Sequence, residues 1–182
     1  MTPTSTASGL AAVLLSGLFA GFLTTVSVLE ATLRSYGGGV YTQVRLIELQ
    51  HLDDLAATLL LPAILTAAVL TVAMIRQSDS RRAALIAATA VALLVTSLLI
   101  SLVISVPINI EQQGWQVSSP PGDWAAVRDR WQAAHLARTT TSVLAFVLLT
   151  AAVGPLRRSR QTPDHRQTPD HLAANSTRGD HR

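Results

Sequence analysis

The chain has 182 residues and a mean hydropathy of +0.37; 49% of its residues are hydrophobic, 14% are charged and only 4% are aromatic, which is typical of lipid-facing helices and unusual for a soluble core. All 14 basic residues are arginines that flank apolar runs and form no basic stripe with interleaved aromatics, so a nucleic-acid-binding surface is excluded. Cysteine is absent, which excludes disulfides, thiolate metal sites and thiol redox chemistry.

Four uncharged apolar runs follow one another, at residues 9–29, 55–75, 83–110 and 139–156, and the last can extend back to residue 136. About 20 helical residues are needed to cross a hydrocarbon core of about 30 Å. The first run lacks a positively charged leader and a small-x-small cleavage site, so it is expected to be an uncleaved helix. We predict an all-α integral membrane four-helix bundle over residues 1–160, with helices at about 9–29, 55–75, 83–110 and 136–156.

The placement of arginine predicts the orientation of the bundle in the membrane. Connection 76–82 holds three arginines against one acid, and three more arginines follow the fourth run at positions 157, 158 and 160. Connection 30–54 has two arginines against four acids, and connection 111–138 is balanced. Because an excess of arginine in short loops marks the cytoplasmic side, both termini are expected to be cytoplasmic in a multi-pass protein of the plasma (inner) membrane.

The C-terminal residues 161–182 are expected to form a disordered cytoplasmic tail. The six residues 160–165 (RQTPDH) are repeated directly at 166–171, in a segment that is polar and contains proline. The histidines in this repeat are explained better by duplication of coding sequence than by a metal site.

Polar residues cluster near the ends of the apolar runs that this orientation places outside. Acids and histidines at membrane depth are costly, so a cluster of them indicates a candidate site. The members are Glu30 after the first run, Glu48, His51, Asp53 and Asp54 before the second, Asn109 and Glu111 at the end of the third, and His135 and Arg138 before the fourth. If the chain has a site, the sequence predicts it at the outer mouth of the bundle.

The segment before the fourth run carries an unusual helical stripe. Asp123 is a good N-cap after Pro120-Pro-Gly, and the residues after it that recur at spacings of 4, 3, 4 and 3 share one face of the predicted helix. They are Trp124, Arg128, Trp131, His135 and Arg138. Asp129 and Arg130 point about 100° and 200° away from Arg128. We therefore predict a helical extension that closes over the bundle mouth.

Residues 106–138 resemble the signature of the anthrone oxygenase-like membrane family. The motif reads Val-Pro-Ile-Asn at 106–109, then Trp115, then Trp-x3-Arg-x-Arg-Trp-x3-His-x2-Arg from 124 to 138. The resemblance extends loosely over residues 10–156 in the layout of four helices and a polar outer loop. It implies an oxygenase-like activity on polyketide-type anthrones for some members of that family.

Each candidate residue also has a structural interpretation. The three tryptophans, Trp115, Trp124 and Trp131, are candidates for substrate binding, but Trp also anchors helices at the membrane interface. The catalytic candidates are His135, Arg128, Arg138 and Asn109. The arginines can equally neutralise buried acids, Asn109 can satisfy loose carbonyls beside Pro107, and a lone histidine is more often a packing residue.

A metal site is a further alternative. Glu48 and His51 stand at the i, i+3 spacing by which one helix presents two ligands in carboxylate-bridged di-metal bundles. With Glu30 and His135 they form a possible ligand set, although the second Glu-x-x-His pair of such bundles is missing. Imidazole and carboxylate suit iron, zinc or copper. The expected cofactor is therefore none or a single transition-metal site.

Two functions from different classes follow from these residues. The first is a small membrane oxidoreductase that admits a hydrophobic aromatic substrate from the outer leaflet, with His135 removing a proton and Arg128 or Arg138 holding the anion. The second is a non-enzymatic membrane protein, such as a transport accessory or assembly factor, in which the polar cluster is an ion-paired cap.

Overall fold

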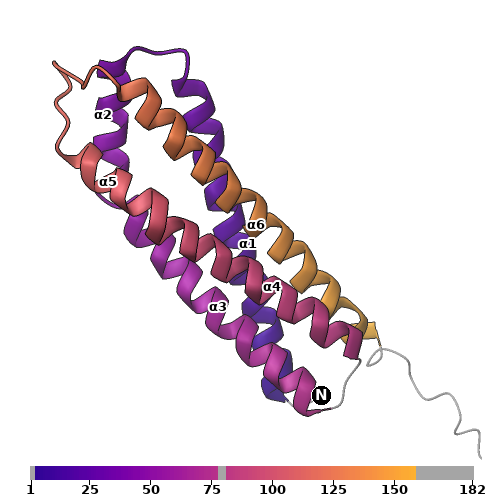
Figure 1. The fold of residues 1–182 in the computed structure, drawn as a ribbon. Helices are drawn as coiled ribbons and strands as arrows, with labels where there is room; N and C mark the ends of the chain where they lie inside the picture. The colour runs from indigo at the N-terminus through magenta and orange to yellow at the C-terminus, as the bar shows by residue number, and fades with distance from the viewer. Residues whose placement is uncertain (1–2, 78–80, 159–182) are drawn as a thin grey trace, which may run out of the picture.

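The protein is described by a computed structural model over residues 3–77 and 81–158 (Figure 1). The predicted tail, with its duplicated hexapeptide, lies outside the described residues. The elements in chain order are α1 (Pro3–Leu33), α2 (Gly38–Glu48), α3 (Leu52–Arg76), α4 (Arg81–Ile100), the π-helix η1 (Ser101–Ser105), α5 (Val106–Gln113) and α6 (Trp124–Arg158). No strand occurs in these ranges, so the all-α prediction is confirmed.

Four helical segments are long and apolar enough to cross a membrane: Thr6–Leu33, Leu52–Arg76, Arg81–Gln113 and Trp124–Gly154. Each overlaps one of the four predicted spans and is longer than it, although the fourth ends at Gly154, before the predicted end at residue 156. The third joins α4, η1 and α5 without a break, and the fourth joins the predicted stripe helix to the last span as one helix. The chain is thus a multi-pass membrane protein built on four spans.

The four spans pack side by side as a bundle. α1 contacts α3 and α6, and α4 contacts the same two helices, as Figure 1 shows. Small residues lie at the centre of these contacts, including Ala63, Ala67, Ala87, Ala90 and Ala145, all fully buried. Because lipid tails are as apolar as leucine, membrane helices associate through close van der Waals packing, which small side chains allow. Larger aliphatic side chains such as Leu14 and Leu65 face outward.

Helix α2 was not predicted, because residues 30–54 were interpreted as a connection. This segment contains an amphipathic helix of 11 residues whose buried face is Tyr41, Thr42, Arg45 and Glu48. Together with α5 it lies at the end of the bundle opposite the chain's N-terminus (Figure 1). We call this the loop end, since it also carries the connection between α5 and α6.

The bounds of α2 and α3 correct the interpretation of Glu48 and His51. α2 ends at Glu48, and His51 is the N-cap residue of α3. The two residues therefore do not stand one turn apart on a single helix, and the i, i+3 ligand pair of a di-metal bundle is not formed here. The chain turns between them because α2 folds back across the loop end before α3 enters the bundle.

The third span contains a π-helical turn at Ser101–Ser105, directly before Pro107. Proline has no backbone N–H to donate to the preceding turn, so the hydrogen-bond ladder loosens there. A π turn is wider than an α turn and places its side chains differently around the helix axis. This irregular stretch faces α6, and it forms one wall of a groove described below.

Candidate functional site

A group of polar side chains is buried together at the loop end of the bundle. Its members come from the four helices α1, α2, α5 and α6 and are each less than a tenth exposed: Glu30, Arg45, Glu48, Asn109, Gln112, His135 and Arg138. Burying polar or charged groups costs free energy unless they are paired, so each of them requires partners or a function. The structure thereby brings Glu30, Glu48, Asn109, His135 and Arg138, which the sequence had singled out, to one end of the bundle.

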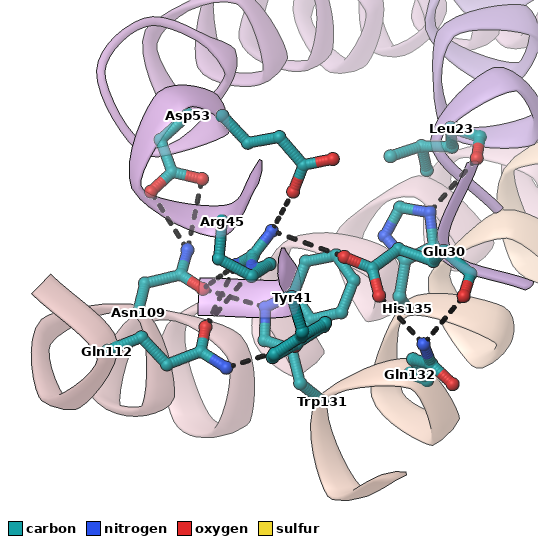
Figure 2. Close-up of polar contacts among 11 residues, drawn as sticks. Leu23, Glu30, Tyr41, Arg45, Asp53, Asn109, Gln112, Trp131, Gln132 and His135 are labelled. Atoms are coloured by element: carbon teal, nitrogen blue, oxygen red, sulfur yellow. Dashed lines mark hydrogen bonds and ion pairs between the residues drawn. The ribbon is translucent and has the colours of Figure 1, made fainter. Parts of the chain in front are cut away.

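Arg45 of α2 lies at the centre of this group (Figure 2). Its Nη1 forms an ion pair with Glu48 and lies 3.6 Å from Oε1 of Glu30. Its Nε and Nη2 both donate to Oε1 of Gln112 at 3.1 Å, and Nη2 also donates to Oδ1 of Asn109 at 3.0 Å. One guanidinium thus links α1, α2 and α5, and it neutralises carboxylates that would otherwise be buried alone.

Asn109 has partners on three other helices. Its Oδ1 accepts from Arg45 and from Nε1 of Trp131 at 2.7 Å, and its Nδ2 donates to both carboxylate oxygens of Asp53 at 3.0 and 2.8 Å. The side chain was predicted to be catalytic. In the structure, its polar atoms hold α2, α3, α5 and α6 together at the loop end.

His135 of α6 is oriented by two contacts. Its Nε2 lies 3.0 Å from the carbonyl oxygen of Leu23, and the ring stacks on Trp131 with centroids 4.8 Å apart and planes 9° apart. Since a carbonyl only accepts, Nε2 must carry the hydrogen, and in neutral imidazole Nδ1 then holds the free lone pair. Nδ1 is buried and has no hydrogen-bond partner among the described residues. The ring is therefore held with its basic nitrogen unused.

His135 lines a small cavity together with Arg138, Glu48 and Asp53. The cavity volume is about 20 Å³, and its other walls are mostly apolar side chains of α1 and α3, such as Phe22 and Leu52. About 10–15 Å³ is enough to hold one water molecule. The cavity thus has room for a molecule of that size and not for an aromatic ring system.

Arg138 lines this cavity without a direct ion pair, although Asp53 in the same lining interacts with it electrostatically. The residue is 7% exposed, it has no ion-pair partner among the described residues, and its Nε–H donates no hydrogen bond there either. Oε1 of Glu48 is also buried and without a hydrogen-bond partner in the same part of the chain. A buried cation and a free basic nitrogen thus meet at one cavity, which is an arrangement suited to binding and moving charge.

A wider cleft lies between α1 and α6, on the other side of His135. Its volume is about 150 Å³, and its lining includes Ser27, Glu30, Gln132 and His135. Nε2 of Gln132 donates to the Glu30 carboxylate at 2.7 Å and to its backbone oxygen at 2.9 Å. His135 is the residue that this cleft shares with the small cavity.

Two of the predicted tryptophans and one arginine lie away from the cavity. The rings of Trp115 and Trp124 pack around Tyr41, with centroids 6.4 and 5.7 Å from it. Arg128 lies over the Trp124 ring at 5.0 Å and pairs with Asp129 at 3.0 Å. Of the predicted stripe, only Trp131, His135 and Arg138 line the cavity, because the first turns of α6 extend beyond it.

The predicted metal ligands do not form a ligand cluster. Glu30, Glu48 and His135 lie around the buried network, but His51 is exposed at the start of α3. Within residues 3–77 and 81–158, no group of three or more His, Asp or Glu side chains could hold a metal ion. The carboxylates that a metal would need are instead directed at Arg45 and Gln132.

Sequence reasoning missed Arg45, Gln112, Tyr41 and Gln132. Gln112 donates to the Tyr41 hydroxyl at 3.2 Å, and burial raises the pKa of Tyr41, with the nearby Glu30 carboxylate adding to the effect. Tyr41, Arg45 and Glu48 follow one another at spacings of 4 and 3 in the sequence. That helical periodicity of polar residues was the available signal for α2 and its buried face.

Comparison with known families and proteins gives one match. The model of a family described as anthrone oxygenase matches residues 53–148, slightly more than half of the chain. The matched region covers the second span from its second residue, the whole third span and most of the fourth, together with Asn109, Trp131, His135 and Arg138, whereas α1 and α2 precede it. No curated protein and no solved structure matches the chain.

Proposed function

The chain belongs to the anthrone oxygenase family, and from that premise we propose that it is a small membrane oxygenase acting on a hydrophobic aromatic substrate at the loop end of the bundle. The observation that carries this proposal is the pairing of two unused groups at one cavity. Nδ1 of His135 is a buried base without a hydrogen-bond partner, and Arg138 is a buried cation that forms no ion pair in the described chain, with Asp53 as the acid that interacts with it electrostatically.

These two groups have complementary roles in oxidising an acidic methylene group. His135 Nδ1 takes a proton from the carbon, and the charge of Arg138 stabilises the anion that remains. The carbanion's electron pair forms a C–O bond to dioxygen, and the resulting peroxide accepts the proton. Loss of the second C–H proton with cleavage of the O–O bond leaves a ketone and releases water. Carbon is oxidised from CH₂ to C=O, and one molecule of O₂ is reduced to one carbonyl oxygen and one water.

The two hollows beside His135 suit the two reactants. The smaller hollow, of about 20 Å³, suits a molecule the size of water or dioxygen. The aromatic substrate needs the larger cleft between α1 and α6, which lies between two membrane spans. His135 lies between them, and a carbon held in the cleft can therefore give up its proton to the imidazole. No step in this scheme requires a metal ion.

We place the loop end on the outer face of the plasma (inner) membrane, with both termini cytoplasmic. The support is the excess of arginine in connection 76–82 and after residue 156, at the opposite end of the bundle. A hydrophobic substrate would then reach the cleft from the outer leaflet.

A second candidate is a non-enzymatic membrane protein in which the polar group is a structural cap. It is favoured by the hydrogen bonding of Arg45, whose nitrogens are engaged by Glu48, Asn109 and Gln112. A network of this kind can hold α2 over the bundle without taking part in chemistry. It does not account for the unpaired atoms of His135 and Arg138 at the cavity.

The test is oxidation of an anthrone by the purified protein in detergent, followed by dioxygen consumption and ketone formation against a protein-free background. His135→Gln keeps an N–H for the Leu23 carbonyl and lacks the basic nitrogen, and we expect it to lower the rate about 10²–10⁴-fold. Arg138→Gln should lower it about 10²–10³-fold. Arg81→Gln, an exposed arginine at the other end of the bundle, is the matched control and should retain the wild-type rate.

The comparison is valid only if both variants still purify as folded bundles. Circular dichroism and size-exclusion chromatography check this. Turnover by His135→Gln at the wild-type rate would remove His135 from the site. A wild-type protein that leaves the background rate unchanged with a series of anthrones would favour the structural cap.

A further inference from the structure

A second hollow lies on the opposite side of α6 from His135, between that helix and the irregular part of the third span. One wall is aliphatic and includes Val103, Ile104 and Pro107 at the π-helical turn. The facing wall on α6 is built from small residues, and the volume is about 670 Å³. This volume lies within the range of about 300–1,000 Å³ that small-molecule sites occupy, and it is far larger than that of the small cavity beside His135.

The groove is open because the side chains of its two walls are too small or too far apart to fill it. Ala133, Ala134 and Ala137 present only methyl groups on the α6 side, and the π turn displaces the side chains of the other wall. Val103 is 71% exposed, so the groove opens at the surface of two spans where lipid tails lie. Its occupant is therefore expected to have an apolar part.

Polarity changes along the groove in one direction. The two helices run antiparallel, so Glu111 of α5 and Arg130 of α6 both lie at the loop end, whereas Ile100 and Ala137 lie toward the middle of the membrane. At a rise of about 1.5 Å per residue, Glu111 lies about 16 Å from Ile100 along the axis of the third span, and Arg130 lies about 10 Å from Ala137 along the axis of α6. The groove thus has a charged end and an apolar end, as an amphiphile standing in one leaflet requires.

The charged end carries both signs. Glu111 and Arg130 line the same groove, yet neither side chain has an ion-pair or hydrogen-bond partner within the described ranges. A phosphodiester complements the guanidinium, and a primary ammonium can donate hydrogen bonds to the carboxylate. A quaternary ammonium cannot donate, and an uncharged glycerol head group leaves the carboxylate without a cation.

We propose that this groove binds one phospholipid with an ethanolamine head group, its phosphate on Arg130, its ammonium on Glu111 and an acyl chain along the alanine wall. The proposal is independent of the oxygenase function, since none of these residues lines the cavity or the cleft beside His135. The lipid would fill the gap that the π turn leaves between the third and fourth spans.

The experiment is native mass spectrometry of delipidated protein in detergent with added dioleoyl phospholipids that carry ethanolamine, choline or glycerol head groups. The wild type should retain one ethanolamine lipid in preference to the other two. Ala137→Leu should narrow the groove and lose this lipid, whereas Ala151→Leu, at an exposed alanine on α6 outside the groove, should retain it. Glu111→Gln should remove the preference for ethanolamine over glycerol, and Arg130→Gln should weaken all three lipids about two- to fivefold, as expected for one exposed ion pair.

Asp54→Asn, at an exposed acid of the loop end on α3, is the charge control and should bind as the wild type does. Equal retention of all three lipids, or of the ethanolamine lipid by Ala137→Leu, would overturn the proposal. Displacement of the lipid by an anthrone would also overturn the proposal, and so would a dimer whose formation excludes the lipid. In either case the groove would bind a different occupant.

Discussion

Replacing Arg45 by methionine tests whether the buried network stabilises the bundle. Methionine keeps an apolar stem of similar length and removes only the guanidinium. The Arg45 side chain is 4% exposed and lies between the carboxylates of Glu30 and Glu48, which are 3% and 5% exposed. Removing one partner of a buried ion pair leaves an uncompensated charge and costs about 3–5 kcal/mol. We expect Arg45→Met to lower the free energy of unfolding by that amount.

The assay is unfolding of the purified protein in mixed micelles with increasing denaturing detergent. The matched control is Arg34→Met, since Arg34 pairs with Asp129 at 2.8 Å where both side chains are about half exposed. An exposed pair contributes only about 0–1 kcal/mol, so this variant should unfold nearly as the wild type does.

A second substitution separates the lost charge from lost packing. Glu48→Gln in the Arg45→Met background removes one of the two carboxylates left without a cation, so the double variant should be more stable than Arg45→Met alone. The reasoning is refuted if Arg45→Met unfolds within about 1 kcal/mol of the wild type. It is also refuted if Glu48→Gln restores nothing, since the cost would then come from packing and not from unpaired charge.

Three further predictions concern orientation, pH and the tail. A reporter active only outside the cytoplasm should work when inserted at Gly122 and be silent at Ser78; the reverse pattern would place the candidate site in the cytoplasm. Because burial raises the pKa of Tyr41 above its ordinary value of 10.0, the unfolded chain releases this proton first as the pH rises. The free energy of unfolding should therefore fall above about pH 10, by up to about 1.4 kcal/mol per pH unit. This fall should be shallower in Tyr41→Phe. It should be unchanged in the control Tyr36→Phe, because the Tyr36 ring is exposed. Truncation after Arg160 should leave the unfolding midpoint unchanged, because the removed residues are polar and carry none of the family motif; a lower midpoint would show that they pack on the bundle.

The stripe on α6 shows how far periodicity alone can place side chains. Spacings of 4 and 3 put Trp124, Arg128, Trp131, His135 and Arg138 on one helical face. The last three do meet at the cavity, but Arg128 pairs with Asp129, which the angular argument had directed away from it. Periodicity fixes directions around a helix axis, whereas the position of the neighbouring helices along that axis decides which turns of the face are covered.

The sequence by itself determined the four spans, because the length and hydropathy of an apolar run are local properties matched to the thickness of a bilayer. It also determined the family, since the motif before the last span is contiguous in the chain. Only the tertiary structure decided the contents of the site. Arg45 meets Gln112 across 67 positions and Asn109 across 64, and those contacts exist only after α2 has folded over the bundle mouth. The same packing leaves Nδ1 of His135 and Nε of Arg138 without hydrogen-bond partners, and no spacing within one helix reports which buried atoms go unpaired.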